Sequence, residues 1–255
     1  MQLQDILYSQ GFGTRRICAG LIQQGRVQVY QDDPADSQGR CQIPVTVTQA
    51  STEVPAKRLR FKVCGDDWVY HERAYLMLHK PAAFECSHKP STYPSVYTLL
   101  PSPLRMRPQK KAIQGVQAVG RLDQDTTGLL LLTDDGQWVH RLSSPRHHLP
   151  KVYEVSLKHP ADDVQMDRLL TGVVLDDSPD PVRASACCAV SPCHLRLTLT
   201  QGKYHQVKRM VAAVGNRVNA LHRSQIGGLR LPDTLAPGQW QWLGADDLAA
   251  LNAIS

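Results

Sequence analysis

Residues 120–136 read GRLDQDTTGLLLLTDDG, and this stretch combines a polar turn with an apolar run. Two acids, Asp123 and Asp125, lie in a short polar turn that runs into four consecutive leucines at 129–132. An unbroken apolar run of this length is typical of a strand buried on both faces. We therefore expect the turn to be held against a rigid core, where loops often carry function; a plain acidic surface turn is the alternative.

The composition suggests two domains and an anionic partner. The chain has 255 residues, enough for a small domain followed by a medium-sized one. Its 29 Lys and Arg residues against 23 Asp and Glu residues give a formal net charge of +6. This modest excess is concentrated in a few places, which makes contact with a polyanion plausible.

Membrane and metal functions are disfavoured by the sequence. No apolar run approaches the roughly 20 residues that a membrane-spanning helix needs. The first five residues, MQLQD, lack the basic and apolar regions of a signal peptide, so we expect a soluble, cytoplasmic protein without a membrane partner. Seven cysteines without a Cys-x-x-Cys pair predict reduced, mostly buried thiols and no metal site.

The N-terminal residues predict a compact basic module. A first helix over residues 1–10 would bury Leu3, Ile6 and Leu7, and Thr14 can cap a second one. The second helix would turn three apolar residues inward: Ile17, Leu21 and Ile22. Three basic residues suit contacts with a phosphate backbone: Arg15, Arg16 and Arg26. A strand near 27–29 and alternating strands near 43–47 and 59–63 complete the module, with a boundary within 65–73.

The larger C-terminal part alternates strands and helices. Strands are expected near 75–78, 151–157, 195–199 and within 218–243, and helices after Thr133 or Asp134 and over 162–171. Tyr153 should point inward from its strand. Two proline-containing stretches suit basic loops, the first of them mobile. The first contains Arg105, Arg107, Lys110 and Lys111, and the second contains Arg146 and His147.

A further helix begins within residues 202–210 and carries basic residues on defined faces. Its apolar stripe has the i, i+3, i+4, i+7 spacing and consists of Val207, Met210, Val211 and Val214. At 100° per residue, Lys208 flanks this stripe and can reach a buried site. On the same projection His205 and Arg209 lie opposite the stripe, where they would meet solvent or a polyanion.

Two chemistries of paired acids fit the turn poorly. An EF-hand register would put Asp123 and Asp125 at calcium-loop positions 1 and 3, but position 9 would be Leu131 and position 12 an Asp. An aspartyl-phosphate enzyme needs an apolar strand directly before its nucleophile, and residues 119–122 make a poor one. Asp125 and Thr127 instead suit turn formation through bonds to their own backbone.

Three ordered motifs carry a resemblance to a known family. The stretch 120–129 resembles the catalytic motif of RNA pseudouridine synthases, Lys151-x-Tyr153-x-Val155 is similar to the second motif, and residues 202–210 with 221–223 resemble the third. Residues 133–138 and 144–148 are similar to the branch that modifies small-subunit ribosomal RNA.

The resemblance implies an α+β fold in two domains. Residues 1–70 would form a small S4-like RNA-binding domain, although the match is weak over 31–72. Residues 71–255 would form the pseudouridine synthase catalytic domain, built on a mainly antiparallel mixed β-sheet with flanking helices.

The resemblance also implies roles for individual residues. Asp123 would be the nucleophile, attacking C1′ or C6 of a flipped-out uridine, with Lys208 beside it. Arg121 would fill the vacated space or bind the nucleotide's phosphate, and Tyr153 would pack on the uracil. RNA contacts are expected from a wider basic set: Arg15, Arg16, Arg26, Lys110, Lys111, Arg146, His147, His205 and Arg209.

The implied reaction defines the expected partners. Pseudouridine formation adds nothing to the RNA, so no cofactor is expected. The expected partner is small-subunit ribosomal RNA, free or in an assembling particle, with uridine 516 of 16S rRNA as the target and a monomer as the acting species. The alternatives are a synthase acting on 23S rRNA and a non-catalytic RNA-binding relative.

Overall fold

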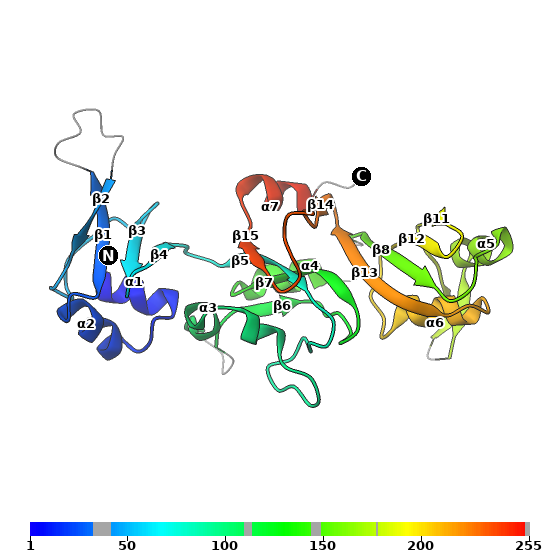
Figure 1. Cartoon of the computed structure of the whole chain (residues 1–255), viewed down its shortest axis with the longest axis horizontal. Helices are drawn as coiled ribbons and strands as arrows, with labels where there is room; N and C mark the ends of the chain where they lie inside the picture. Colours follow the sequence, from blue (N-terminus) through cyan, green and yellow to red (C-terminus); the bar gives the residue numbers. More distant parts are fainter. Residues whose placement is uncertain (33–41, 110–113, 144–148, 177, 253–255) are drawn as a thin grey trace. The chain divides into compact units, whose positions relative to one another are not determined.

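The computed structural model describes residues 1–32, 42–109, 114–143, 149–176 and 178–252 (Figure 1). Its contacts divide the chain into two compact units, Met1–Ala74 with Leu100–Gln117, and Tyr75–Leu99 with Ala118–Ser255. The first unit therefore extends past residue 70 and takes in Leu100–Gln117, a segment that the sequence suggested for the catalytic domain.

The first unit combines three helices with a small antiparallel sheet. Its helices are α1 (Leu3–Gln10), α2 (Arg15–Gln23) and α3 (Ser102–Met106). The sheet has the order β2-β1-β3-β4, with β1 (Val27–Asp32), β2 (Gln42–Thr46), β3 (Arg60–Val63) and β4 (Asp66–Val69). The two helices and the strands expected in this part of the sequence are thereby confirmed.

The helices of this unit form where the sequence predicted, with one residue misassigned. Leu3, Ile6 and Leu7 are fully buried, and the Thr14 hydroxyl accepts the first-turn N–H of Ile17 at 3.3 Å. The side chain of Ile17 itself is 52% exposed, so its expected inward orientation is wrong. The buried residues of α2 are Cys18 and Ile22. They are four positions apart, so they lie on the same face of the helix.

The first stretch expected to form a basic loop, which contains Arg107, is partly packed into the first unit. Arg107 is 2% exposed, and its guanidinium donates to the side-chain oxygen of Gln10 at 3.0 Å and to the carbonyl of His71 at 2.8 Å. A buried guanidinium needs such acceptors because its desolvation is otherwise costly. The prediction of a mobile loop is therefore wrong for Arg107, while Lys110 and Lys111 lie outside the described residues.

The second unit is built on one large mixed sheet. The strand order is β11-β12-β8-β13-β7-β5-β15, with β14 beside β13 and β6 beside β7. Among these pairs, β7 with β13 is parallel and the other neighbours along the main path are antiparallel. The strands are β5 (Tyr75–Lys80), β6 (Gln117–Val119), β7 (Thr127–Thr133), β8 (Lys151–Leu157), β11 (Ala186–Ser191), β12 (His194–Leu199), β13 (Val218–Ile226), β14 (Leu229–Arg230) and β15 (Trp240–Trp242). The α+β class with a mainly antiparallel mixed sheet is confirmed.

Helices and a small hairpin accompany this sheet. They are the 3-10 turn η1 (Val96–Leu99), α4 (Gly136–Ser143), α5 (Asp163–Thr171), α6 (Gln206–Ala213), α7 (Ala245–Asn252) and the pair β9 (Val173–Leu175) with β10 (Ser178–Val182). The helix predicted over 162–171 is confirmed, with Asp162 as its N-cap. We did not expect α7, because its sequence ADDLAALN is too short to show a clear period.

The leucine run forms the centre of the sheet as predicted. Residues 129–132 on β7 are at most 1% exposed, and β7 pairs with β5 on one side and with β13 on the other. The following helix is capped differently from expectation. Asp135, instead of Thr133 or Asp134, accepts the N–H groups of Gln137 at 2.9 Å and Trp138 at 3.2 Å.

The cysteine side chains differ from the expectation of mostly buried thiols. Of the six cysteines in the described residues, all are free thiols but only Cys18 is buried, so the expectation of mostly buried thiols is wrong. Within the described residues, no helix combines the length and apolar character that crossing a bilayer requires.

We expect Gly128→Ala to destabilise the fold more than Gly120→Ala. Both glycines have positive φ, at +108° and +72°, so alanine is strained at either position. At Gly128 a new Cβ would also lie 2.3 Å from the carbonyl oxygen of Arg223 on β13, whereas nothing lies within 4 Å at Gly120. The free energy of unfolding should therefore fall by about 1–3 kcal/mol more for Gly128→Ala. Urea denaturation checks this, and equal midpoints for the two variants would contradict it.

Candidate active site

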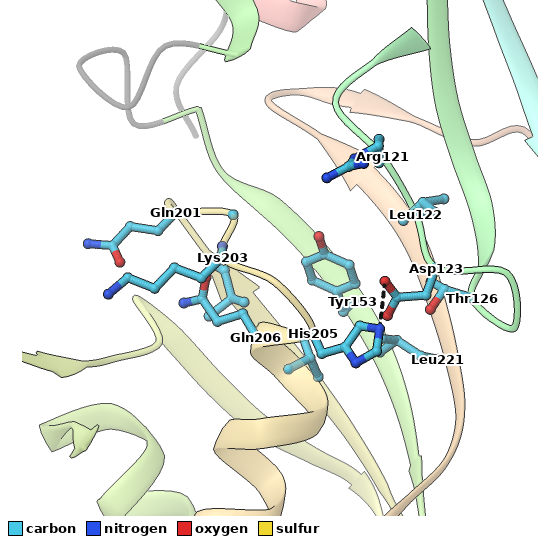
Figure 2. Close-up of a pocket in the computed structure, with 13 residues that line it drawn as sticks. Arg121, Leu122, Asp123, Thr126, Tyr153, Gln201, Lys203, His205, Gln206 and Leu221 are labelled. Atoms are coloured by element: carbon cyan, nitrogen blue, oxygen red, sulfur yellow. Dashed lines mark hydrogen bonds and ion pairs between the residues drawn. The ribbon is translucent and has the colours of Figure 1, made fainter. Parts of the chain in front are cut away.

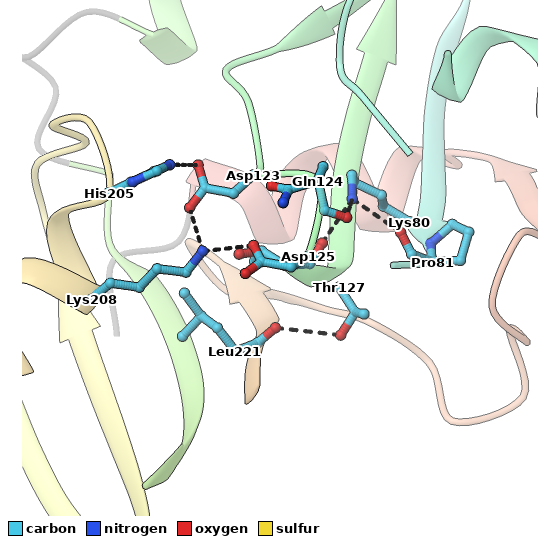
Figure 3. A network of polar contacts seen from close by, with 10 residues as sticks. Lys80, Pro81, Asp123, Gln124, Asp125, Thr127, His205, Lys208 and Leu221 are labelled. Atoms are coloured by element: carbon cyan, nitrogen blue, oxygen red, sulfur yellow. Dashed lines mark hydrogen bonds and ion pairs between the residues drawn. The ribbon is translucent and has the colours of Figure 1, made fainter. Parts of the chain in front are cut away.

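A buried lysine holds the main chain of the acidic turn. Lys80, at the end of β5, is fully buried, and its ammonium donates to the carbonyls of Pro81 at 3.0 Å, Gln124 at 3.2 Å and Thr126 at 2.9 Å (Figure 3). Desolvation lowers the pKa of Lys80 below its ordinary value. Because two of the three acceptors belong to the turn, the ammonium fixes the backbone from which the Asp123 side chain projects.

The end of the turn is tied to the neighbouring strand. The Thr127 hydroxyl lies 2.9 Å from Nδ1 of His222 and 3.5 Å from the carbonyl of Leu221, both on β13. The sequence suggested that Thr127 bonds its own backbone, so this expectation is wrong. Its side chain instead links the turn to the parallel neighbour of β7.

Two acids of the turn share one ammonium. Nζ of Lys208, on α6, lies 3.1 Å from Oδ2 of Asp123 and 2.6 Å from Oδ1 of Asp125 (Figure 3). The sequence predicted that Lys208 reaches toward Asp123, and the structure brings the two together. Asp125 has a charged partner as well, so its expected role as a plain turn former is incomplete.

The shared contacts favour the charged forms of Lys208 and Asp125. Although desolvation acts against the ammonium, hydrogen bonds to Asp125 and Asp123 raise the pKa of Lys208 above its ordinary value. Desolvation likewise opposes ionisation of Asp125, but the hydrogen bond from Lys208 lowers its pKa overall. Asp123 and Lys208 are only about a quarter exposed, at 24% and 25%, so solvent screens their attraction incompletely.

Asp123 faces a pocket between the turn and the segment that leads into α6. Tyr153, on β8, is 9% exposed and has its ring in this pocket, and Arg121 lies at another part of the wall (Figure 2). The remaining lining residues come from the turn, from the segment that runs from the end of β12 into the first turn of α6, and from β13: Leu122, Thr126, Leu199, Gln201, Gly202, Lys203, His205, Gln206, Val207 and Leu221. Three residues singled out from the sequence, Arg121, Asp123 and Tyr153, thus line one pocket.

His205 also lines the pocket, against expectation. Its Nε2 lies 3.4 Å from Oδ1 of Asp123, whereas Lys208 contacts the other oxygen, Oδ2 (Figure 3). The helical projection placed His205 wrongly because this residue precedes α6 and has a left-handed backbone conformation, with φ of 48°. By contrast, Arg209 lies within α6 and donates to the carbonyl of Tyr204 at 3.3 Å.

The other predicted RNA contacts lie elsewhere. Arg15, Arg16 and Arg26 are exposed residues of the first unit. Arg146 and His147, like Lys110 and Lys111, fall outside the described residues. Lys80 was missed by the sequence reasoning, although a lysine that ends an apolar strand next to a proline could have drawn attention to it.

Comparison with known proteins identifies the family of this chain. A sequence model of the family described as RNA pseudouridylate synthase matches residues 74–213, more than half of the chain. The chain belongs to this family. Its site residues Asp123, Tyr153 and Lys208 all fall within the matched range.

Similar proteins define the branch of the family. The protein named Ribosomal small subunit pseudouridine synthase A from Yersinia pestis is 44% identical over 179 residues, covering 70% of this chain and 73% of that protein. The protein of the same name from Escherichia coli K12 is 42% identical over 181 residues, covering 71% and 75%. This pseudouridine synthase is therefore related to the small-subunit synthase A branch, as the motifs predicted.

A solved structure agrees over almost the whole chain. The crystal structure of a pseudouridylate synthase superposes with a TM-score of 0.64 at 30% sequence identity, covering 98% of this chain and 99% of that one. At this coverage the likeness includes most of residues 1–73, which the family model does not match. The S4-like character expected for the first unit stays a prediction.

We expect Lys80→Met to lower both stability and pseudouridine formation. Methionine fills similar space but removes the Lys80 donor from three carbonyls, of which that of Gln124 still accepts the N–H of Ala83. The loss costs about 1–3 kcal/mol and frees the turn that carries Asp123. Lys151→Met is the matched control, because Nζ of Lys151 donates to a single carbonyl, that of Leu149 at 2.8 Å. Urea denaturation and turnover of an RNA substrate measure the two effects. A Lys80→Met enzyme as stable and active as Lys151→Met would contradict this role.

Proposed function

We propose that this enzyme isomerises a uridine of small-subunit ribosomal RNA to pseudouridine, with uridine 516 of 16S rRNA as the target. The name shared by relatives at 37–44% identity, Ribosomal small subunit pseudouridine synthase A, supports the RNA class, and the target position rests on resemblance to their branch. The observation that carries the mechanism is the carboxylate of Asp123, which faces the pocket with Lys208 3.1 Å from one oxygen.

The reaction requires a nucleophile in its ionised form. The N1–C1′ bond of uridine breaks, the uracil rotates, and C5 joins C1′ while the C5 proton is lost and N1 gains one. Asp123 attacks either C1′, releasing uracil, or C6, forming an adduct, and both routes use the carboxylate form. Lys208 supports that form because an ammonium close to a partly buried carboxylate offsets the cost of its desolvation.

The pocket also fits a base removed from its stack. The enzyme cannot reach C1′ or C5 inside a helix, so the nucleotide must be extruded at a cost of a few kcal/mol. The largely buried ring of Tyr153 offers a stacking surface, and base–aromatic stacking is worth about 1–3 kcal/mol. Arg121, exposed at the pocket wall, suits the vacated space or the phosphate of the flipped nucleotide.

The first unit suits binding of the surrounding RNA. We assign it the S4-like RNA-binding role, with the exposed arginines of α2 and the residue before β1 contacting phosphates. Such contacts position the RNA without reading its sequence. The pocket of the second unit then supplies the chemistry.

Two alternatives make different predictions for the same assay. A synthase acting on 23S rRNA would modify that transcript instead, and a non-catalytic relative would modify neither. The second alternative is disfavoured because Asp123 retains its basic partner. Reverse-transcription mapping of pseudouridine in 16S and 23S transcripts treated with the enzyme separates the three possibilities, and absence of new pseudouridine from both would refute the proposal.

We expect Asp123→Asn to abolish pseudouridine formation and Asp125→Asn to reduce it only partly. Both variants remove one carboxylate from the same ammonium, so they perturb Lys208 in a comparable way. Only Asp123 lines the pocket. Single-turnover rates on a 16S transcript provide the measurement. Equal losses in the two variants would show that the ion pair matters and that neither acid is the dedicated nucleophile.

We expect Arg16→Gln and Arg26→Gln to weaken RNA binding and to flatten its salt dependence. Each lost phosphate contact should lower the slope of log K against log salt by about 1. Arg15→Gln serves as the comparison, because Asp5 lies 3.0 Å from the Arg15 guanidinium and already neutralises part of its charge. Filter binding across a salt series measures the slopes. Slopes that equal the wild-type value in all three variants would argue against RNA binding by this unit.

A further inference from the structure

His205 has a backbone conformation that is uncommon for residues other than glycine. Its φ and ψ are 48° and 32°, and it is the N-cap residue of α6 without a side-chain hydrogen bond to the first turn. Non-glycine residues in this region are often found at functional sites, where the surrounding structure maintains the strain. The imidazole is therefore not explained by helix capping.

The left-handed turn directs the imidazole at Asp123. Nε2 of His205 lies 3.4 Å from Oδ1, and Lys208 lies 3.1 Å from Oδ2, so each carboxylate oxygen has its own basic neighbour. The ring of Tyr204 stacks on the imidazole with a centroid separation of 3.9 Å and an interplanar angle of 18°. The ring of His205 thus contacts both Tyr204 and Asp123. Figure 2 shows the imidazole directed at the Asp123 carboxylate.

We propose that His205 is a positioning residue for Asp123, a role that rests on the nucleophilic function proposed above. Contacts at both oxygens fix the rotation of the carboxylate about its Cβ–Cγ bond, which lowers the entropy cost of reaching the reactive geometry. The longer contact is the one to Oδ1. Oδ1 is thus the oxygen released more readily for attack, while Oδ2 keeps its partner Lys208.

The attack needs no proton from the imidazole. If Oδ1 bonds to C1′, the electron pair of the C1′–N1 bond leaves with the uracil. If it bonds to C6, the C5–C6 π pair moves toward O4 of the base. In both routes the negative charge passes from the carboxylate to the base, so His205 acts only by orienting Asp123 beforehand.

Three substitutions separate the side chain of His205 from its backbone. Asparagine and glycine tolerate the left-handed region but cannot bring a donor to the position of Nε2. Glutamine is strained there, yet its terminal amide can reach the same place. We expect His205→Asn and His205→Gly to lower the single-turnover rate by about 10- to 100-fold at unchanged RNA affinity, and His205→Gln to recover part of the rate.

The outcomes of these measurements are distinct. Wild-type rates in His205→Asn and His205→Gly would overturn the proposal and leave only a backbone role. Weaker RNA binding with an unchanged rate would overturn it in favour of the RNA-contact role first expected for His205. Urea denaturation of each variant confirms that the folded population is compared.

A measurement without RNA distinguishes failure of this inference from failure of the proposed function. We expect Asp123→Asn to shift the imidazole ¹⁵N resonances of His205 in the full chain, and to do so more than Asp125→Asn, whose carboxylate is not the one contacted. Unshifted resonances would overturn the inference even in an active enzyme. A shift in an enzyme that forms no pseudouridine would support the contact and reject the function.

Discussion

The site depends on one buried ammonium. Lys80 is surrounded by three carbonyls, two of them from the turn that carries Asp123, and it has no exposed surface. A buried cation is costly unless its donors are satisfied, so the turn must adopt the conformation that supplies these acceptors. The position of the proposed nucleophile is thereby determined by the end of β5, a strand distant in sequence, and not by the local preferences of the turn.

The remaining geometry brings charge to this fixed point from α6. Lys208 contacts Asp123 and Asp125 together, and His205 contacts the free oxygen of Asp123. One ammonium is shared by two carboxylates, so Lys208 is not the exclusive partner of Asp123. A reaction that moves negative charge from a carboxylate onto a departing base is helped when the nucleophile is oriented by a cation but not tied to it alone.

The sequence predicted the parts of this arrangement that follow from periodicity. The pattern of a single element was enough to place residues 129–132 in a buried strand, Tyr153 on an inward face and Lys208 beside an apolar stripe. No such pattern could place Lys80, Arg107 or His205. The first two depend on carbonyl acceptors brought near by tertiary folding, and the third on a left-handed residue just before a helix, where a helical projection has no meaning.

The carbonyl cage around Lys80 also links local and global opening of the protein. If the turn were to detach while β5 stayed in the sheet, the Lys80 ammonium would lose the two carbonyl acceptors that the turn supplies. Such a partly open state is costly, so the turn and β5 belong to one cooperative unit in native-state fluctuations. The proposed active site, although it is a loop, is then as protected against transient unfolding and amide exchange as the centre of the sheet.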